Sequence, residues 1–127
     1  MRNILLVEDD TVTRQYLSFL LEEKGYSVRQ AENGRQALAG LDADGQPELV
    51  IVDIFMPEMD GIEIIIHFKE SGISCPILAI SGGGSDGDLT YLGYAKSLGA
   101  CETLEKPFAD EEFLDTVSNV FARQATQ

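Results

Sequence analysis

The chain has 127 residues, of which 44% are hydrophobic, enough for one well-buried core and too few for two ordinary domains, so we expect a single domain over residues 1–127. Its 9 basic and 22 acidic residues give a formal charge of −13, which argues against a nucleic-acid partner and permits metal cations and basic protein surfaces. No apolar run approaches the roughly 20 residues of a membrane span, and the N-terminus lacks the pattern of a signal peptide. We therefore expect a cytoplasmic protein with no membrane partner.

Short apolar runs alternate with helical patterns along the first half of the chain. A strand is predicted at residues 4–7, followed by a helix that Gly25 ends. Residues 26–31 form a more polar run, typical of a strand at a sheet edge, and Asn33 is placed to cap a second helix. The apolar residues that repeat at helical spacing are Val12, Tyr16, Phe19 and Leu20 in the first helix and Ala37, Leu38 and Leu41 in the second.

The second half of the chain continues the alternation. The run LVIVD predicts a central strand buried on both faces, and a third helix follows Gly61. PILAIS is the fourth strand, GGGSDGD a glycine-rich loop before a helix, and residues 102–105 a weak fifth strand that Pro107 ends. The apolar residues of the last two helices are Leu89, Leu92 and Ala95, then Phe113, Leu114, Val117, Val120 and Phe121. Five βα repeats indicate a doubly wound α/β domain with a five-stranded parallel sheet and five helices.

Polar residues stand where the predicted strands end. Glu8 and Asp9 follow the first strand, Asp53 ends the third, Ser81 ends the fourth and Lys106 follows the fifth. Because the carboxyl ends of parallel strands share one edge of a sheet, these side chains should converge there. Acids also collect at the start of a helix, but that explanation covers only the residues that follow the first strand.

Three converging carboxylates favour a hard divalent cation, and Mg²⁺ suits a site that combines carboxylates with phosphate oxygens. A carboxylate can also act as a nucleophile and form an acyl phosphate, whose charge the cation, the Lys106 ammonium and the Ser81 hydroxyl could neutralise. Cys75 and Cys101 form no C-x-x-C pair and are interpreted as inert thiols, and His67 as a solvated surface residue.

With these residues in place, the sequence resembles the receiver domain of two-component response regulators over essentially its whole length. The resemblance is carried by ILLVEDD, VDIFMPEMDG, a hydroxyl at the end of the fourth strand, and EKPF. It implies a flavodoxin-like fold with strand order 2-1-3-4-5. It also implies a phosphorylation-dependent signalling switch, with output by protein–protein interaction.

The resemblance assigns a role to each site residue. Asp53 is the expected acceptor of a phosphoryl group from a histidine kinase or histidine phosphotransfer protein, and Ser81 and Lys106 the groups that bind that phosphoryl group. The expected Mg²⁺ ligands are Glu8, Asp9, Asp53 and the backbone carbonyl of Phe55. Pro57 and Gly61 are expected to shape the turn beside the site, and the bond to Pro107 is expected to be cis.

One position departs from the family pattern. Receivers usually carry Tyr or Phe three residues before the lysine, where this chain has Thr103, so the usual aromatic readout of phosphorylation is in doubt. We hypothesise that the loop with Gly82, Gly83, Gly84 and Gly87, together with the following helix, moves instead.

The third helix, GIEIIIHFKE, contains more isoleucine than a core-facing stripe needs. Ile62, Ile65 and Phe68 suffice for that stripe, which leaves Ile64 and Ile66 on other faces. Chance exposure of single residues is the better interpretation there, and a partner surface the lesser one.

Two other functions compete with the switch. An Mg²⁺-dependent hydrolase with an aspartyl-phosphate intermediate is the alternative, but phosphatases of the haloacid-dehalogenase type place an acid–base aspartate where this chain has Phe55. A degenerate interaction module conflicts with the intact set of site residues. The expected enzymatic content is limited to self-phosphorylation from phosphohistidine donors and autodephosphorylation. The start at Met1 and the polar end favour a stand-alone protein of the chemotaxis-regulator kind, and many receivers form homodimers on phosphorylation.

Overall fold

The computed structural model describes residues 2–54, 61–72, 75–81 and 99–125. Its strands are β1 (Asn3–Val7), β2 (Ser27–Ala31), β3 (Leu49–Asp53), β4 (Ile77–Ser81) and β5 (Glu102–Glu105). Its helices are α1 (Thr11–Glu23), α2 (Gly34–Asp44), α3 (Gly61–Glu70) and α5 (Asp110–Ala125). The predicted helix before β5, the glycine-rich loop ahead of it, Phe55 and Pro57 lie outside the described residues.

All five strands run parallel in one sheet of order β2-β1-β3-β4-β5, which confirms the predicted doubly wound topology. Every residue of β3 and β4 is buried, whereas β2 and β5 form the two edges and are more exposed. The chain leaves β1 toward β2 on one side and returns to β3 on the other. The carboxyl ends of β1 and β3 therefore flank the point where the winding direction changes, which is where ligands bind in such sheets.

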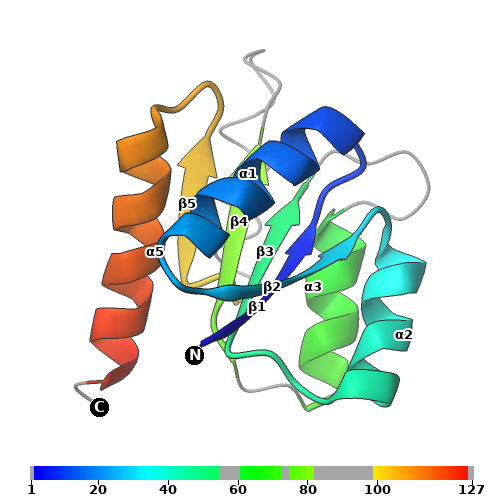
Figure 1. Ribbon diagram of the computed structural model, residues 1–127. Helices are drawn as coiled ribbons and strands as arrows, with labels where there is room; N and C mark the ends of the chain where they lie inside the picture. The colour runs from blue at the N-terminus through cyan, green and yellow to red at the C-terminus, as the bar shows by residue number, and fades with distance from the viewer. Residues whose placement is uncertain (1, 55–60, 73–74, 82–98, 126–127) are drawn as a thin grey trace.

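Two layers of helices cover the sheet (Figure 1). One apolar cluster packs α2 and α3 against the sheet, and the other packs α1 and α5 against its opposite face. In α5 the predicted stripe is confirmed, since Phe113, Val117, Val120 and Phe121 are buried and Leu114 packs half-buried against the same cluster. Each such side chain contributes about 2 kcal/mol relative to an exposed position, so the two clusters hold the strand ends in place.

Local sequence signals set the helix starts and one helix end. The side chain of Asp10 accepts a hydrogen bond from the amide of Thr13 at the start of α1, and Asn33 caps α2 through the amide of Gln36. Gly25, just after α1, has a φ of 93°, a conformation that costs glycine no steric strain. The predicted cap at Asn33 and the predicted stop at Gly25 are both confirmed.

The core-facing side of α1 differs from the stripe that the sequence indicates. Val12 and Phe19 are 76% and 56% exposed, whereas Leu17 and Leu21 are buried against the sheet. Successive helical residues are about 100° apart, so Leu21 lies about 180° around the axis from Val12. The helix therefore carries two apolar stripes, and its packing buries the second one.

The face of α3 is also wider than predicted. Ile64 is fully buried together with Ile65 and Phe68, Ile62 is buried at 8% exposure, and Ile66 is half-buried. Ile64 lies about 40° from Phe68 around the helix axis, so it is part of the same apolar face. The placement of Ile64 off the core was wrong, because α3 packs against α2 as well as against the sheet.

The residues without an assigned role behave largely as expected. His67 is exposed, Cys75 is buried and Cys101 is half-buried, and both cysteines are free thiols. Burial raises the pKa of Cys75 to about 11, which keeps that thiol protonated and unreactive. Among the described helices, none combines the length and the apolar character required to cross a membrane.

Candidate functional site

The end of β1 delivers two carboxylates to the edge of the sheet. The amide of Glu8 donates a 3.0 Å hydrogen bond to the carbonyl of Ala31, which extends the pairing of β1 with β2 by one residue. The carboxylate of Asp10 accepts hydrogen bonds from the amide and hydroxyl of Thr13, at 2.9 and 2.6 Å. Helix capping therefore explains Asp10, and leaves Glu8 and Asp9 for another role.

Glu8, Asp9 and Asp53 converge as the strand order requires. Each offers a carboxylate oxygen, and the three oxygens all lie within 4.8 Å of one another. Glu8 and Asp53 are buried, at 2% and 6% exposure, and Asp9 is the most open of the three. Two unit charges at this separation repel by about 3 kcal/mol at an effective dielectric constant of 20, so the cluster requires positive charge nearby.

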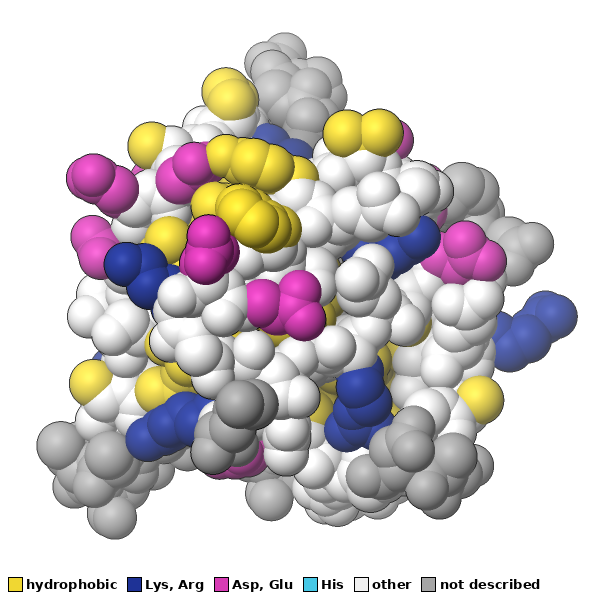
Figure 2. Space-filling view, in the orientation of Figure 1, with side chains coloured by type: hydrophobic (Ala, Val, Ile, Leu, Met, Phe, Trp, Pro, Cys, Tyr) yellow, Lys and Arg dark blue, Asp and Glu magenta, His cyan; other side chains and the backbone are white. Residues whose placement is uncertain are grey.

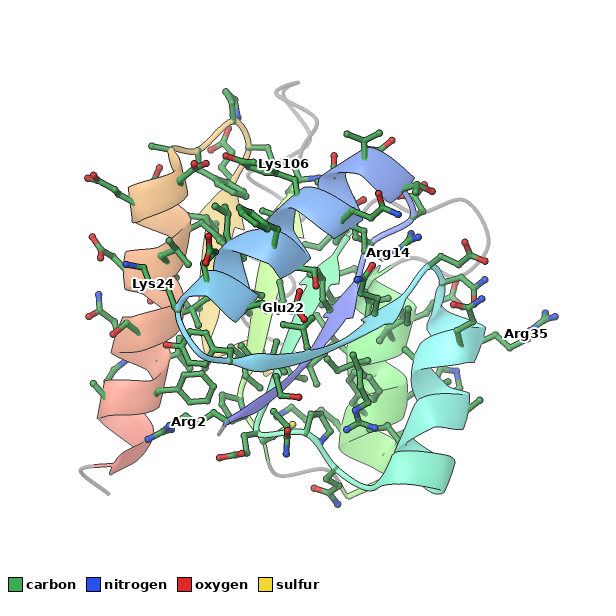
Figure 3. The ribbon with its side chains drawn as sticks, in the orientation of Figure 1. Arg2, Arg14, Glu22, Lys24, Arg35 and Lys106 are labelled. Atoms are coloured by element: carbon green, nitrogen blue, oxygen red, sulfur yellow. The ribbon has the colours of Figure 1, made fainter. Side chains whose placement is uncertain are left out.

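Lys106 supplies part of that charge. Its Nζ lies 2.8 Å from Oε1 of Glu8 and 3.4 Å from Oδ2 of Asp53 (labelled in Figure 3). Its amide donates to the carbonyl of Ser81 at 2.7 Å, which continues the pairing of β4 with β5 up to the lysine. The next peptide bond, to Pro107, is cis, as predicted.

Burial and charge shift the protonation of these groups. Burial raises the pKa of Glu8, the hydrogen bond from Lys106 opposes this shift, and the charge of Asp53 adds to it. Burial also raises the pKa of Asp9, as does the neighbouring Glu8. Burial alone would lower the pKa of Lys106, but its hydrogen bond to Glu8 and the charge of Asp53 raise it. The lysine therefore stays charged, while Glu8 and Asp9 hold protons more readily than ordinary carboxylates.

Ser81 adds a hydroxyl at the end of β4. Its Oγ is fully buried and has no hydrogen-bond partner among the described residues. A buried hydroxyl without a partner costs about 1–3 kcal/mol, so this side chain suits a polar ligand. Thr103 pairs with Ala79 in the sheet register and is half-buried, and Gly61 begins α3.

The residues fit a hard divalent cation. Carboxylate oxygens are the ligands that Mg²⁺ and Ca²⁺ prefer, and the negative charge of the three acids exceeds the positive charge that Lys106 brings to them. The fourth ligand that the resemblance implies, the carbonyl of Phe55, lies outside the described residues.

A model of the response regulator receiver domain matches residues 4–118 of the chain. The chain belongs to the response regulator receiver family. Members of this family are signalling switches of two-component systems, typically without enzymatic activity, and receiver domains partner with histidine kinases. The family and the acidic cluster together support phosphorylation on aspartate and the binding of a divalent metal.

Curated relatives agree with this assignment. Response regulator MprA of Mycolicibacterium vanbaalenii is 38% identical over 111 residues, which cover 87% of this chain and 46% of the relative. A CpxR homologue of Haemophilus influenzae, named a transcriptional regulatory protein, is 35% identical over 99% of this chain and 53% of its own. The receiver chain thus spans about half the length of the curated relatives it matches.

Solved structures match the receiver over its whole fold. The chemotaxis protein CheY4 of Vibrio cholerae superposes with a TM-score of 0.84 at 32% identity, covering 94% of this chain and 98% of that one. A receiver domain protein of Clostridium thermocellum superposes with a TM-score of 0.88 at 26% identity, covering 99% and 98%. These matches agree with the strand order and the packing of the described helices.

The sequence left two features of the receiver unassigned. Arg14 lies in the first turns of α1, where the helix dipole disfavours a cation. A cation at this unfavourable position indicates a specific partner for its side chain. The second feature is the exposed apolar stripe on α1, formed by Val12, Tyr16 and Phe19. Helical periodicity revealed the stripe without showing that it faces away from the sheet.

Proposed function

We propose that residues 1–127 form one receiver domain whose Asp53 accepts a phosphoryl group from a histidine kinase or a histidine phosphotransfer protein. The phosphorylated domain then acts through contacts with a target protein. The observation that carries this proposal is the convergence of Asp53 with Glu8, Asp9 and Lys106 at the carboxyl edge of the sheet. Glu8 has the same neighbours, so the choice of Asp53 as the acceptor rests on its place at the end of β3, where the family pattern puts the phosphorylated aspartate.

Phosphorylation of Asp53 exchanges one bond for another. A carboxylate oxygen of Asp53 attacks the phosphorus of the phosphohistidine, the new P–O bond forms as the P–N bond breaks, and the electron pair returns to the imidazole nitrogen. Hydrolysis of the aspartyl phosphate returns the domain to its unphosphorylated state. Water attacks the same phosphorus, the P–O bond to Asp53 breaks, and inorganic phosphate leaves the free carboxylate behind.

Lys106 and Ser81 bind the phosphoryl oxygens. The Lys106 ammonium already lies 3.4 Å from Asp53 and follows the charge as it moves onto the phosphoryl group. The Ser81 hydroxyl, which lacks a partner among the described residues, donates a hydrogen bond to one of those oxygens. Phosphorylation therefore gives the Ser81 hydroxyl a hydrogen-bond partner. This gain stabilises the phosphorylated conformation relative to the unphosphorylated one.

Glu8, Asp9 and Asp53 hold Mg²⁺, with the Phe55 carbonyl as the further ligand that the family pattern implies. When bound, the cation neutralises charge on the phosphoryl group and on the acids around it. Thr103, Pro57, Gly61 and Pro107 are assigned structural or switching roles at the rim of the site.

The exposed face of α1 is proposed as the docking surface for the donor protein. A groove of about 340 Å³ runs between α1 and the start of α5, and Val12, Tyr16, Phe108 and Lys106 are among the residues that line it. Because Lys106 also contacts Asp53, a donor protein bound in this groove reaches the phosphorylation site. Figure 2 shows hydrophobic side chains gathered on this face with acidic ones around them. The formal charge of −13 favours a donor with basic residues around an apolar centre.

Intact-mass spectrometry after incubation with acetyl phosphate tests the proposal. A single phosphoryl adduct that requires Mg²⁺ and is absent from Asp53→Asn is the expected result. If acetyl phosphate yields no adduct, a phosphohistidine donor protein is tried next. An unmodified chain with both donors contradicts the proposed function.

A further inference from the structure

Arg14 reaches back from α1 to the main chain that carries two of the site carboxylates. Its Nη1 donates a 2.9 Å hydrogen bond to the backbone carbonyl of Glu8, in a partly buried position. Figure 3 shows the labelled arginine between the start of α1 and β2. A cation near a helix N-terminus opposes the helix dipole, so this position needs a compensating interaction. The carbonyl of Glu8 provides one.

The guanidinium of Arg14 is itself held from the other side. Its Nε donates to Oε1 of Gln30 on β2 at 3.2 Å, and Nε2 of Gln30 donates to Oγ of Ser18 at 3.2 Å. Ser18 is only 2% exposed although it lies on the sheet-facing side of α1, where an apolar residue is usual. A buried hydroxyl there requires a partner, and Gln30 is that partner. Two hydrogen bonds therefore link Arg14, Gln30 and Ser18 in series.

The carbonyl that Arg14 contacts sets the direction of the next residue. The carbonyl of Glu8 and the amide of Asp9 belong to one planar peptide unit, so fixing the carbonyl fixes the plane from which Asp9 leaves. Asp9 is the most open of the three carboxylates, and packing constrains it least. Its approach to Glu8 and Asp53 therefore depends on how the main chain is oriented.

We infer that Arg14 is a positioning residue for the cation site, which holds the Glu8–Asp9 peptide so that the three carboxylates converge. The inference rests on the proposed function and extends it to the support of that site. Gln30 and Ser18 keep the guanidinium in the orientation that reaches the carbonyl.

A purely structural role for Arg14 makes a different prediction. The start of α1 is also held by the Asp10 cap and by the 3.0 Å hydrogen bond from the Glu8 amide to Ala31, and both remain when the arginine side chain is shortened. The fold should therefore survive Arg14→Gln. If the arginine only ties α1 to β2, its loss lowers the melting temperature and leaves the affinity for Mg²⁺ unchanged.

The direction in which the Mg²⁺ affinity changes distinguishes positioning by Arg14 from an effect of its charge alone. Arg14 donates to the backbone carbonyl of Glu8, so its charge lies beside the acidic cluster. Removing a cation beside an acidic cluster would by charge alone strengthen Mg²⁺ binding. Positioning predicts the opposite, a weaker Mg²⁺ complex. Arg35→Gln makes the same change of charge on an exposed side chain of α2 that points to solvent, and serves as the matched control (Figure 3).

Isothermal titration with Mg²⁺ alone, on the full chain without any phosphoryl donor, is the test. We expect the Kd of Arg14→Gln to rise about tenfold, near the lower end of the cost of losing a group that supports metal ligands. Arg35→Gln should bind as the wild type does. Gln30→Ala, which changes no charge, should weaken binding in the same direction by a smaller factor, and Arg14→Lys should restore part of the affinity.

Phosphorylation by acetyl phosphate adds a second readout. With Arg14→Gln the Mg²⁺ concentration for half-maximal rate should rise, while the rate at saturating Mg²⁺ stays close to that of the wild type. An unchanged or lower Kd in Arg14→Gln overturns the inference, and if that variant does not fold, an unchanged Kd in Gln30→Ala does so. Wild-type protein that binds Mg²⁺ but is never phosphorylated on Asp53 contradicts the proposed function alone. Wild-type protein that binds no Mg²⁺ overturns the inference itself.

Discussion

The ammonium of Lys106 lies closer to Glu8 than to the expected phosphorylation site, at 2.8 Å from Oε1 of the glutamate. The distance to Oδ2 of Asp53 is 3.4 Å. The lysine therefore bridges the ends of β1 and β3, and it offsets part of the repulsion that gathering the acids creates. Because Glu8 is almost fully buried, removing the lysine alone costs more than breaking a surface pair would.

Replacing Lys106 by Met should destabilise the receiver by about 2 kcal/mol at pH 7, because a buried carboxylate loses its charged partner. This loss of stability should shrink as the pH falls toward 4.5, the ordinary pKa of a glutamate such as Glu8, because the protonated acid no longer needs the lysine. Urea denaturation at the two pH values measures both effects. Lys24→Met, at an exposed position, is the control. An equal loss at both pH values would contradict the pairing with Glu8.

Asp9→Asn should raise the melting temperature at pH 7 when Mg²⁺ is absent. Burial and Glu8 raise the pKa of Asp9 in the folded protein, so the stability that this residue contributes is present below its ordinary value of 3.8 and lost as the pH rises through the raised pKa. The advantage of the variant should therefore vanish below pH 3.8. Added Mg²⁺ should reverse the order, because only the wild type retains all three carboxylates. Circular dichroism melts with and without Mg²⁺ decide this, and a variant that is less stable in both would refute it.

Ser81→Ala should leave the unphosphorylated receiver as stable as the wild type or slightly more stable. The substitution removes a buried hydroxyl that has no partner among the described residues. Phosphorylation by acetyl phosphate should slow by about tenfold, the effect of losing one hydrogen bond of about 1.5 kcal/mol to a charged group. Ser81→Thr keeps the hydroxyl and should retain most of the rate. A normal rate in the alanine variant would remove Ser81 from the phosphoryl site.

Phe19→Asp and Val12→Asp should impair transfer from a phosphohistidine donor protein and leave the reaction with acetyl phosphate unchanged. Both side chains are exposed, at 56% and 76%, so their replacement costs little stability. We expect kcat/KM for the donor to fall about tenfold, as for truncation of a central interface residue. Asn119→Asp adds the same charge to an exposed position on α5 and is the control. Equal transfer rates for all variants would place the donor on another surface.

Much of the site follows from residue order. An apolar run that ends in a polar residue predicts a strand with that residue at its carboxyl end, and parallel strands bring those ends together. The convergence of Asp53 with Glu8 and Asp9 was therefore predictable, as was the position of Lys106 after the last strand. The carbonyl of Phe55 and the glycine-rich loop stay predictions, since they lie outside the described residues.

Other features depend on how the elements pack. Helical periodicity in α1 identifies two apolar stripes without saying which one meets the sheet, and Leu17 and Leu21 are buried because α1 crosses the sheet with that side inward. The contact between Arg14 and the Glu8 carbonyl forms only when α1 packs beside the end of β1. No local sequence pattern predicts such a contact. Sequence order and hydrophobic spacing are local properties and determine which elements form and which residues end them. The rotation of each helix, and the partners that long side chains reach, are settled by the total packing energy of the folded domain.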